Sequence, residues 1–420
     1  MIKYPPLAWK NPIELLFLIG LIMVLPLLEA PKNLFWLVFL VTWFINRLRD
    51  KNFGGSWDTW DSLITAWILS GYIVALFAGL HHSEWSGAND ILRYGSILWL
   101  IKRSGYQKLE LLWLLASIIV STFIALSVGL WSLYVSHAHK ALELNSVGHV
   151  NHSAIYLTIS YGALLSALLS FWSRIPFIWR LLGGLLTLLF LTAIFISASR
   201  AAVGVALLLT MMLGILWIKR SYYFLLILAS IILASTSIAY IAKIEVITKH
   251  ETDIREKNVL AFRDTIWNSA IVAWRKFPVF GVGMHNFNQI SMPKIKQWVE
   301  ESGKPYVASV YLGMSHGHSL YLNTLAERGL FGLTILLSVL FAWLFWLLRF
   351  IPKASDENIA WAVWGGSFSA WFVTVGIGLV NTTLHHEHGI LSVLLLGIGL
   401  AYRNSIRCIP PDKMLTGVRA

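Results

Sequence analysis

Charge and cysteine are both scarce in this sequence. Charged residues make up 13% of its 420 residues, whereas a soluble domain carries about 25%. Cys408 is the only cysteine, which excludes a disulfide framework and a metal site built from several thiolates. Internal repeats, which many transporters show, are not evident in the sequence. A soluble enzyme, a disulfide-stapled secreted domain and a repeat-built transporter are therefore all disfavoured.

Hydrophobic residues take the place of charge. They form 57% of the chain and gather in long runs, and about 20 residues are needed to cross a bilayer. The runs are too continuous for barrel strands, and a helix satisfies its own backbone groups in lipid. We therefore predict an all-α polytopic membrane protein with about 12 transmembrane helices. The expected segments are roughly 13–29, 33–46, 62–80, 90–101, 110–133, 152–171, 181–197, 201–218, 222–242, 320–348, 359–380 and 389–402.

Lysine and arginine are unevenly distributed among the short connections. With the N-terminus inside, most of them fall on the cytoplasmic side, as the positive-inside rule requires. They include Arg47, Arg49, Lys51, Lys102, Arg103, Lys108, Arg174, Arg180, Lys219, Arg220, Arg349 and Lys353. Both termini are thus predicted to be cytoplasmic. All 13 histidines fall on the opposite, outer side, and because imidazole titrates near neutral pH we interpret that side as the working face.

One connection is far longer than the others. A loop much longer than the other connections of a compact chain is usually functional. The sequence is therefore divided into transmembrane helices one to nine in 1–242, a large outer loop in 243–319, transmembrane helices ten to twelve in 320–402 and a cytoplasmic tail in 403–420.

An amphipathic helix is predicted within this loop, from Arg263 to Trp274. Trp267, Ala270, Ile271 and Trp274 recur at helical spacing and form its apolar face. The helix is expected either to lie on the membrane surface with its tryptophans down or to pack on the roof of the bundle.

Two further outer sites carry polar groups beside apolar spans. Arg200 stands at the junction of two spans and requires either a structural carboxylate or a ligand anion. Asn151 and Ser153 open the sixth span, where either side chain can cap the helix. The alternative is that Asn151 and His152 line a polar substrate groove.

The histidines also raise the question of zinc. His385, His386 and His388 join the last two spans, and His316 and His318 precede the tenth. Imidazole is a common zinc ligand, but this spacing is not a recognisable ligand pattern. No metal site is predicted.

Several of these residues form a known signature. His318-Ser319, then nine residues, then Gly329-Leu330-Phe331-Gly332 resembles the motif of the O-antigen ligase and polymerase superfamily. The sequence is similar to the family in other motifs, in the same order, from Gly148 to the C-terminus. These are Gly148-His149-Val150-Asn151, with Val150 in place of the usual proline, Ser199-Arg200, Arg263, and Phe277-Pro278-Val279-Phe280-Gly281-Val282-Gly283.

The resemblance implies a fold like that of the type C glycosyltransferases and a metal-independent, inverting reaction without a cofactor. The donor would be a glycan on undecaprenyl diphosphate and the acceptor lipid A–core. Transfer would occur at the periplasmic face of a bacterial inner membrane, so that the large loop is periplasmic, with membrane lipids and no nucleic acid as partners. The alternatives are an O-antigen polymerase or a protein O-oligosaccharyltransferase using the same carrier, and, from another class, a polysaccharide transporter or flippase.

Roles follow for the residues that match. Arg200 and Arg263 are expected to clamp the diphosphate, because fixed cations stabilise the charge of a leaving group. His318 is the expected general base. His316, Asn151 and His152 are expected to bind substrate in a secondary role. Glu327 lies 2.5 helical turns beyond His318 and is expected to be structural, with Arg328 as its potential partner.

Overall fold

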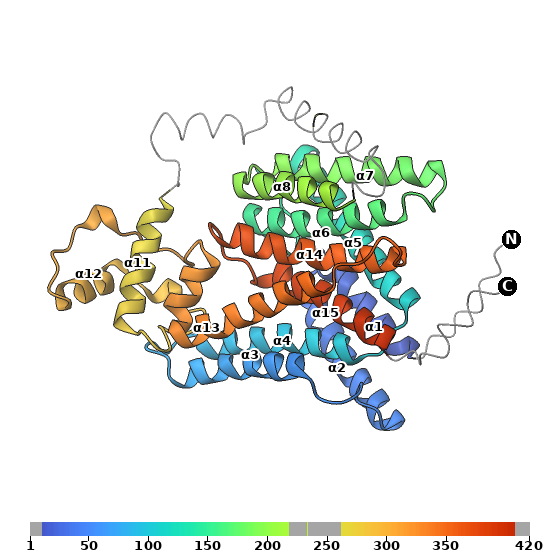
Figure 1. Cartoon of the computed structure of the whole chain (residues 1–420). Coiled ribbons are helices and arrows are strands. Elements are labelled where there is room, and N and C mark those ends of the chain that lie inside the picture. The colour runs from blue at the N-terminus through green and yellow to red at the C-terminus, as the bar shows by residue number, and fades with distance from the viewer. Residues whose placement is uncertain (1–10, 218–232, 234–261, 408–420) are drawn as a thin grey trace.

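The computed structural model describes residues 11–217, 233 and 262–407 of the chain (Figure 1). These residues form helices and connections, with no β-strand among them. Eight of the helices are long and apolar enough to cross a membrane. The prediction of an all-α polytopic membrane protein is confirmed, while the count of twelve spans stays a prediction.

Every predicted span within the described residues corresponds to a helix. Segment 222–242 lies outside them. The bundle consists of α1 Pro12–Val24, α2 Glu29–Asp50, α3 Thr59–Leu76, α4 Glu84–Arg103, α5 Lys108–Tyr134, α6 Val150–Phe171, α7 Phe177–Ile196, α8 Arg200–Trp217, α13 Leu320–Arg349, α14 Asn358–Gly378 and α15 His386–Arg407.

The helices α2 and α4 are longer than predicted because charged residues at their ends are buried in ion pairs. Arg103, in the last turn of α4, donates to Asp61 of α3 at 2.7 Å. Arg47 of α2 donates to Glu14 of α1 at 3.2 Å. These pairs lie at the end of the bundle that was predicted to be cytoplasmic. The first span ends earlier than expected, at Val24, two residues before Pro26.

The helices α6 and α14 form the centre of the bundle, between α7 and α8 on one side and α13 and α15 on the other (Figure 1). Small residues let them approach closely. A Cβ atom on Gly162 would lie 2.5 Å from the Ser369 side chain, and one on Gly365 would lie 2.6 Å from Ser166 Oγ. Contacts of this kind are typical of membrane helix pairs, where lipid supplies no hydrophobic drive.

The described part of the predicted outer loop, residues 262–319, forms a small unit at one end of the bundle, at the left of Figure 1. It contains α11 Arg263–Lys276, α12 Met292–Glu301 and the short 3-10 turns Phe287–Gln289 and Ala308–Val310. It has a hydrophobic core of its own, in which α11 packs on α12 and α13.

The helix predicted at Arg263 is therefore present, but of its four predicted apolar-face residues only Ala270 is fully buried. Ile266, Ala270 and Ala273 are buried, so the face is offset by about one position. The side chain of Trp267 does not belong to the buried face, because its indole N–H donates to the carbonyl of His318 at 3.3 Å. The helix packs on the roof of the bundle, and contact of its tryptophans with lipid stays a prediction.

One break in α13 joins this loop unit to the bundle. At Gly329 the helix adopts φ 61° and ψ −165°. There, the segment Pro278–Gly283 supplies hydrogen bonds that the helix would otherwise make with itself. Val282 N–H donates to Ala326 O at 2.9 Å, and Leu330 N–H donates to Pro278 O at 2.9 Å.

Both glycine motifs meet at this break. A Cβ atom on Gly281 would lie 2.4 Å from the backbone carbon of Glu327, and one on Gly329 would lie 2.2 Å from Val279 O. No real Cβ contact is so short. The two motifs, about 50 residues apart, are therefore the two sides of a single backbone contact.

This contact predicts that Gly329→Ala is strongly destabilising. The φ and ψ of Gly329 fall in a region open essentially to glycine alone, and such strain costs about 1–3 kcal/mol before any steric clash is counted. Thermal unfolding of the purified protein in detergent should show a markedly lower midpoint.

Gly204→Ala is the matched control. Gly204 is exposed on α8 with open space around its Cβ position, so alanine should be neutral or stabilise by up to about 1 kcal/mol. Equal midpoints for the two variants would contradict the assignment.

Candidate active site

Several helices begin at the end of the bundle that carries the loop unit. They are α2, α4, α6, α8, α11, α13 and α15, because successive spans alternate in direction (Figure 1). A helix N-terminus carries about half a positive charge and several backbone N–H donors without a partner in the helix. This end of the molecule therefore favours the binding of an anion.

Arg200 and Arg263 add two full positive charges at the same place. Arg200 is the first residue of α8, and Arg263 is the first residue of α11. A cation at a helix N-terminus opposes the dipole. Burial lowers the pKa of Arg263, and the positive charge of Arg200 lowers it further. The two guanidinium groups therefore lie close enough to repel each other, and a multivalent anion between them would relieve that repulsion.

His318 lies beside this pair at the start of α13. Its backbone is in the left-handed region, with φ 46°, and its N–H donates to His316 Nδ1 at 3.4 Å. The next residue, Ser319, caps the helix by accepting from Leu322 N–H at 3.4 Å. Together with the indole of Trp267 on its carbonyl, these bonds fix the backbone of His318.

The environment of His318 keeps its ring neutral. Burial lowers its pKa to about 3, with further contributions from His316, Arg263 and His149. The atom Nδ1 is buried and has no hydrogen-bond partner among the described residues. A neutral imidazole with such a nitrogen can accept a proton from a substrate hydroxyl.

A cluster of histidine rings surrounds His152 of α6. Its ring centroid lies 5.1–6.1 Å from five other imidazoles. These are His149, His316, His385, His386 and His388. The structure thus brings together His152, His316 and His318 from the predicted site, through the 4.0 Å separation of the last two rings.

Asn151 lies in the same turn of α6, but its side chain makes no hydrogen bond to these rings. The prediction that Asn151 or Ser153 caps α6 is wrong. His149 is the N-cap, and its Nδ1 accepts from Asn151 N–H at 3.2 Å. Ser153 Oγ is engaged instead by Leu144 N–H and Gly148 O, at 2.8 Å each, which fixes the loop before the helix.

Sequence reasoning left His149, His385, His386, His388 and Thr382 without a role. Thr382 Oγ1 lies 3.3 Å from His316 Nδ1 and positions that ring. The only signal in the sequence was that all the histidines fall on one side of the predicted topology.

Glu327 is linked to the histidine motif through hydrogen bonds of neighbouring residues, which is consistent with the structural role expected of it. Its carboxylate accepts from Asn323 Nδ2 at 2.9 Å and from Phe287 N–H at 3.3 Å. Asn323 Oδ1 in turn accepts from Gly317 N–H at 2.8 Å, between the two histidines of the motif. Arg328 donates to Ser70 Oγ at 2.6 Å.

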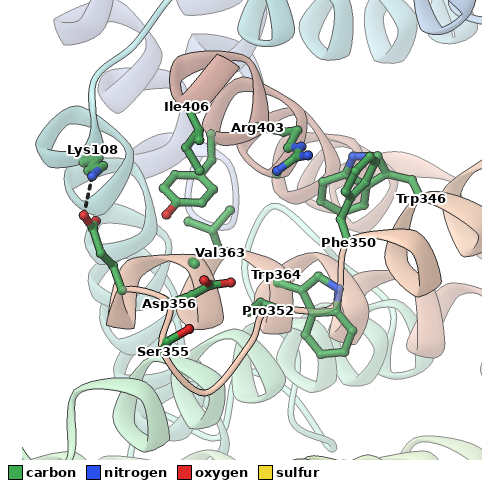
Figure 2. A pocket seen from close by; sticks show the side chains of 14 residues that line it. Lys108, Trp346, Phe350, Pro352, Ser355, Asp356, Val363, Trp364, Arg403 and Ile406 are labelled. Atoms are coloured by element: carbon green, nitrogen blue, oxygen red, sulfur yellow. Dashed lines mark hydrogen bonds and ion pairs between the residues drawn. The ribbon is translucent and has the colours of Figure 1, made fainter. Parts of the chain in front are cut away.

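The volume of the cavities does not identify the candidate site. A cavity of about 430 Å³ lies at the opposite end, lined by Trp346, Phe350, Trp364 and Arg403 and bordered by the Lys108–Glu357 ion pair of 2.6 Å (Figure 2). It contains none of the predicted site residues. A pocket of about 70 Å³ behind the histidines is lined in part by His285, Glu327 and His385. The convergence of charge and imidazole, rather than volume, identifies the candidate site.

Comparison with known families agrees with this geometry. Residues 184–337 match the family model described as O-antigen ligase. This match, which covers somewhat more than a third of the chain, supports a relation to the O-antigen ligase superfamily. No curated protein matches the chain significantly. The matched segment contains Arg200, Arg263, His318 and both glycine motifs, whereas His152 lies outside it.

This match supports a general class of function. The protein is a membrane protein of the O-antigen ligase and polymerase type, similar to glycosyltransferases, and lipid-linked glycans and membrane lipids are consistent partners. For a chain of this superfamily, the two arginines and His318 are the first residues to test.

The arginine pair predicts a diphosphate site that is measurable without turnover. Inorganic pyrophosphate should raise the melting temperature of the purified protein, because ligands that bind only the folded state stabilise it. Arg200→Gln and Arg263→Gln should each weaken this effect by about 10-fold or more in pyrophosphate concentration.

Arg275→Gln is the control, because Arg275 lies exposed in the last turn of the same helix as Arg263. If Arg275→Gln weakens the stabilisation by pyrophosphate equally, the effect depends only on net charge, and the assignment of a diphosphate site to Arg200 and Arg263 is wrong.

Proposed function

We propose that this protein is an O-antigen ligase that transfers polysaccharide from undecaprenyl diphosphate to lipid A–core, at the periplasmic face of the bacterial inner membrane. The convergence of Arg200, Arg263 and His318 from three separate elements supports this proposal most strongly. The ion-paired basic residues at the other end of the bundle support cytoplasmic termini.

The donor diphosphate binds between Arg200 and Arg263, at the N-termini of α8 and α11. There, the guanidinium groups and backbone N–H groups stabilise the negative charge that develops as the diphosphate leaves. The undecaprenyl chain extends into lipid along the bundle, where α8, the helix that begins with Arg200, exposes Leu208, Met211 and Ile215.

His318 acts on the acceptor hydroxyl as general base. The imidazole takes the hydroxyl proton while the hydroxyl oxygen attacks the anomeric carbon from the face opposite the diphosphate. The bond from that carbon to the diphosphate oxygen breaks, and the oxygen keeps the electron pair. Because attack and departure occur on opposite faces, the anomeric configuration inverts. The imidazolium then returns its proton to solvent or to the released diphosphate.

His316, His152 and Asn151 form the acceptor side of the site. Their positions at the starts of α13 and α6 place neutral donors and acceptors beside the base. Such groups suit hydroxyl and phosphate groups of a sugar acceptor. No metal or cofactor is needed for any of these steps.

An O-antigen polymerase or a protein O-oligosaccharyltransferase would use the same donor chemistry. No contact among the described residues favours either of them. A deletion strain discriminates: carrier-linked chains that accumulate without long lipopolysaccharide indicate a ligase, whereas a core carrying a single repeat unit indicates a polymerase.

His318→Ala is predicted to abolish ligation while leaving the donor bound. Loss of a general base costs about 10²–10⁴-fold in rate, which should leave the deletion strain without long lipopolysaccharide. Arg263→Ala should weaken donor binding as well as transfer. The two effects are separated in a purified assay that measures donor binding and ligation independently.

His82→Ala is the control, because His82 is an exposed histidine of the same outer side. It should complement fully. Near-normal ligation by His318→Ala in the purified assay would show that another group is the base.

The pKa of His318 predicts a specific pH dependence. In the free protein, the low pKa keeps the imidazole neutral, so the acid limb of kcat/KM should lie well below the usual histidine value of about 6.5. A bound diphosphate brings negative charge beside Arg263, which favours the imidazolium and raises the pKa. The acid limb of kcat, which reports the substrate complex, should therefore lie at higher pH than that of kcat/KM. Coincident limbs would contradict this coupling.

A further inference from the structure

Three imidazoles of the histidine cluster converge from separate parts of the chain. His152 belongs to α6, while His385 precedes α15 and His386 is its first residue. One ligand nitrogen from each lies within 4.8 Å of the other two. In a tetrahedral zinc site with Zn–N distances of about 2.0–2.1 Å, the nitrogens are separated by about 3.4 Å. Small side-chain rotations would therefore bring the three into one coordination sphere.

The backbone around His385 is arranged to present two consecutive rings to one point. In a regular helix or strand, neighbouring side chains point in different directions. Here, the rings of His385 and His386 lie 3.7 Å apart, because Leu384 and His386 both adopt left-handed backbone angles, φ 54° and φ 46°. Strain of this kind persists where a site requires it. His385 Nδ1 is buried and has no hydrogen-bond partner among the described residues.

Carboxylates balance the positive helix ends on this side of the site. Glu29, Asp90 and Glu387 all lie within electrostatic range of His386. Lys32 offsets part of this charge through its ion pairs with Glu29, at 2.7 Å, and with Glu387. The arginine pair favours an anion, whereas this neighbouring region of the same site favours a cation.

We propose that His152, His385 and His386 bind a divalent transition-metal ion, for which zinc is the natural candidate. Imidazole nitrogens suit zinc, copper and nickel. Three protein ligands leave a fourth position open. The ion would join the connection between α14 and α15 to the start of α6. Neither the arginines nor His318 would be among its ligands, and glycosyl transfer would not require it.

The test is zinc binding by the full-length protein without a polyhistidine tag. After treatment with a chelator, the protein in nanodiscs is titrated with Zn²⁺ by calorimetry near neutral pH. The wild type should bind a single ion. His386→Gln and His385→Ala should each weaken binding by about 100-fold or more, since even outer-shell changes cost 10–100-fold. His82→Ala should bind like the wild type.

Cobalt provides a readout that needs no variant. Bound Co²⁺ should give the intense visible absorption of a tetrahedral nitrogen site. Absence of zinc binding in the wild type, an octahedral cobalt spectrum, or unchanged affinity in both His385→Ala and His386→Gln would each overturn the proposal.

A further measurement rests on the proposed function as well. Because His152 is assigned to the acceptor side, Zn²⁺ should inhibit ligation in competition with the acceptor, and a chelator should restore it. Zinc that binds without affecting transfer would uphold the metal site and remove His152 from the acceptor groove. Inhibition without saturable binding at the histidines would overturn the metal site alone.

Discussion

The structure depends on the backbone contact between Pro278–Gly283 and the break in α13. That contact holds the loop unit to the bundle through main-chain hydrogen bonds to Ala326 and Glu327 before the break and from Leu330 and Phe331 after it. Arg263 enters the site from one side of this joint, through α11, and His318 from the other, through the first turns of α13. Their relative position is thus fixed by backbone geometry that only glycine permits. This gives a physical reason for two motifs that look unrelated in the sequence.

The positive electrostatic potential at this end of the molecule follows from the direction of the helices. Several helix N-termini lie at one end of the molecule, and two of these helices, α8 and α11, begin with arginine. In each case the cation costs about 0.3–1 kcal/mol against the dipole. The same arrangement is favourable as soon as a diphosphate is bound, since dipoles, backbone donors and guanidinium groups then all act on one anion.

The sequence predicts those features that depend on local composition and misses those that depend on burial. Apolar runs located every span within the described residues, yet α2 and α4 were cut short because Arg47 and Arg103 are buried in ion pairs that no hydropathy pattern reveals. The buried face of α11 differs from the predicted apolar face because the indole N–H of Trp267 donates a hydrogen bond to the His318 carbonyl, and the ring is not fully buried. The histidine cluster joins His152 to His386 across more than 230 residues, so ligand spacing along the chain could not show it.

In the mechanism we propose, the arginines and His318 act as one functional unit rather than two. A negative charge about 6 Å from an imidazole, at an effective dielectric constant of about 20, contributes about 3 kcal/mol, or about two pKa units. A diphosphate held by Arg200 and Arg263 would therefore both bind and strengthen the base. In that mechanism, the imidazole would be a weak base until the donor is in place, and proton removal would be coupled to donor binding. Removing an arginine would weaken the base as well as the grip on the carrier, so losses from substitutions at Arg263 and His318 cannot be added.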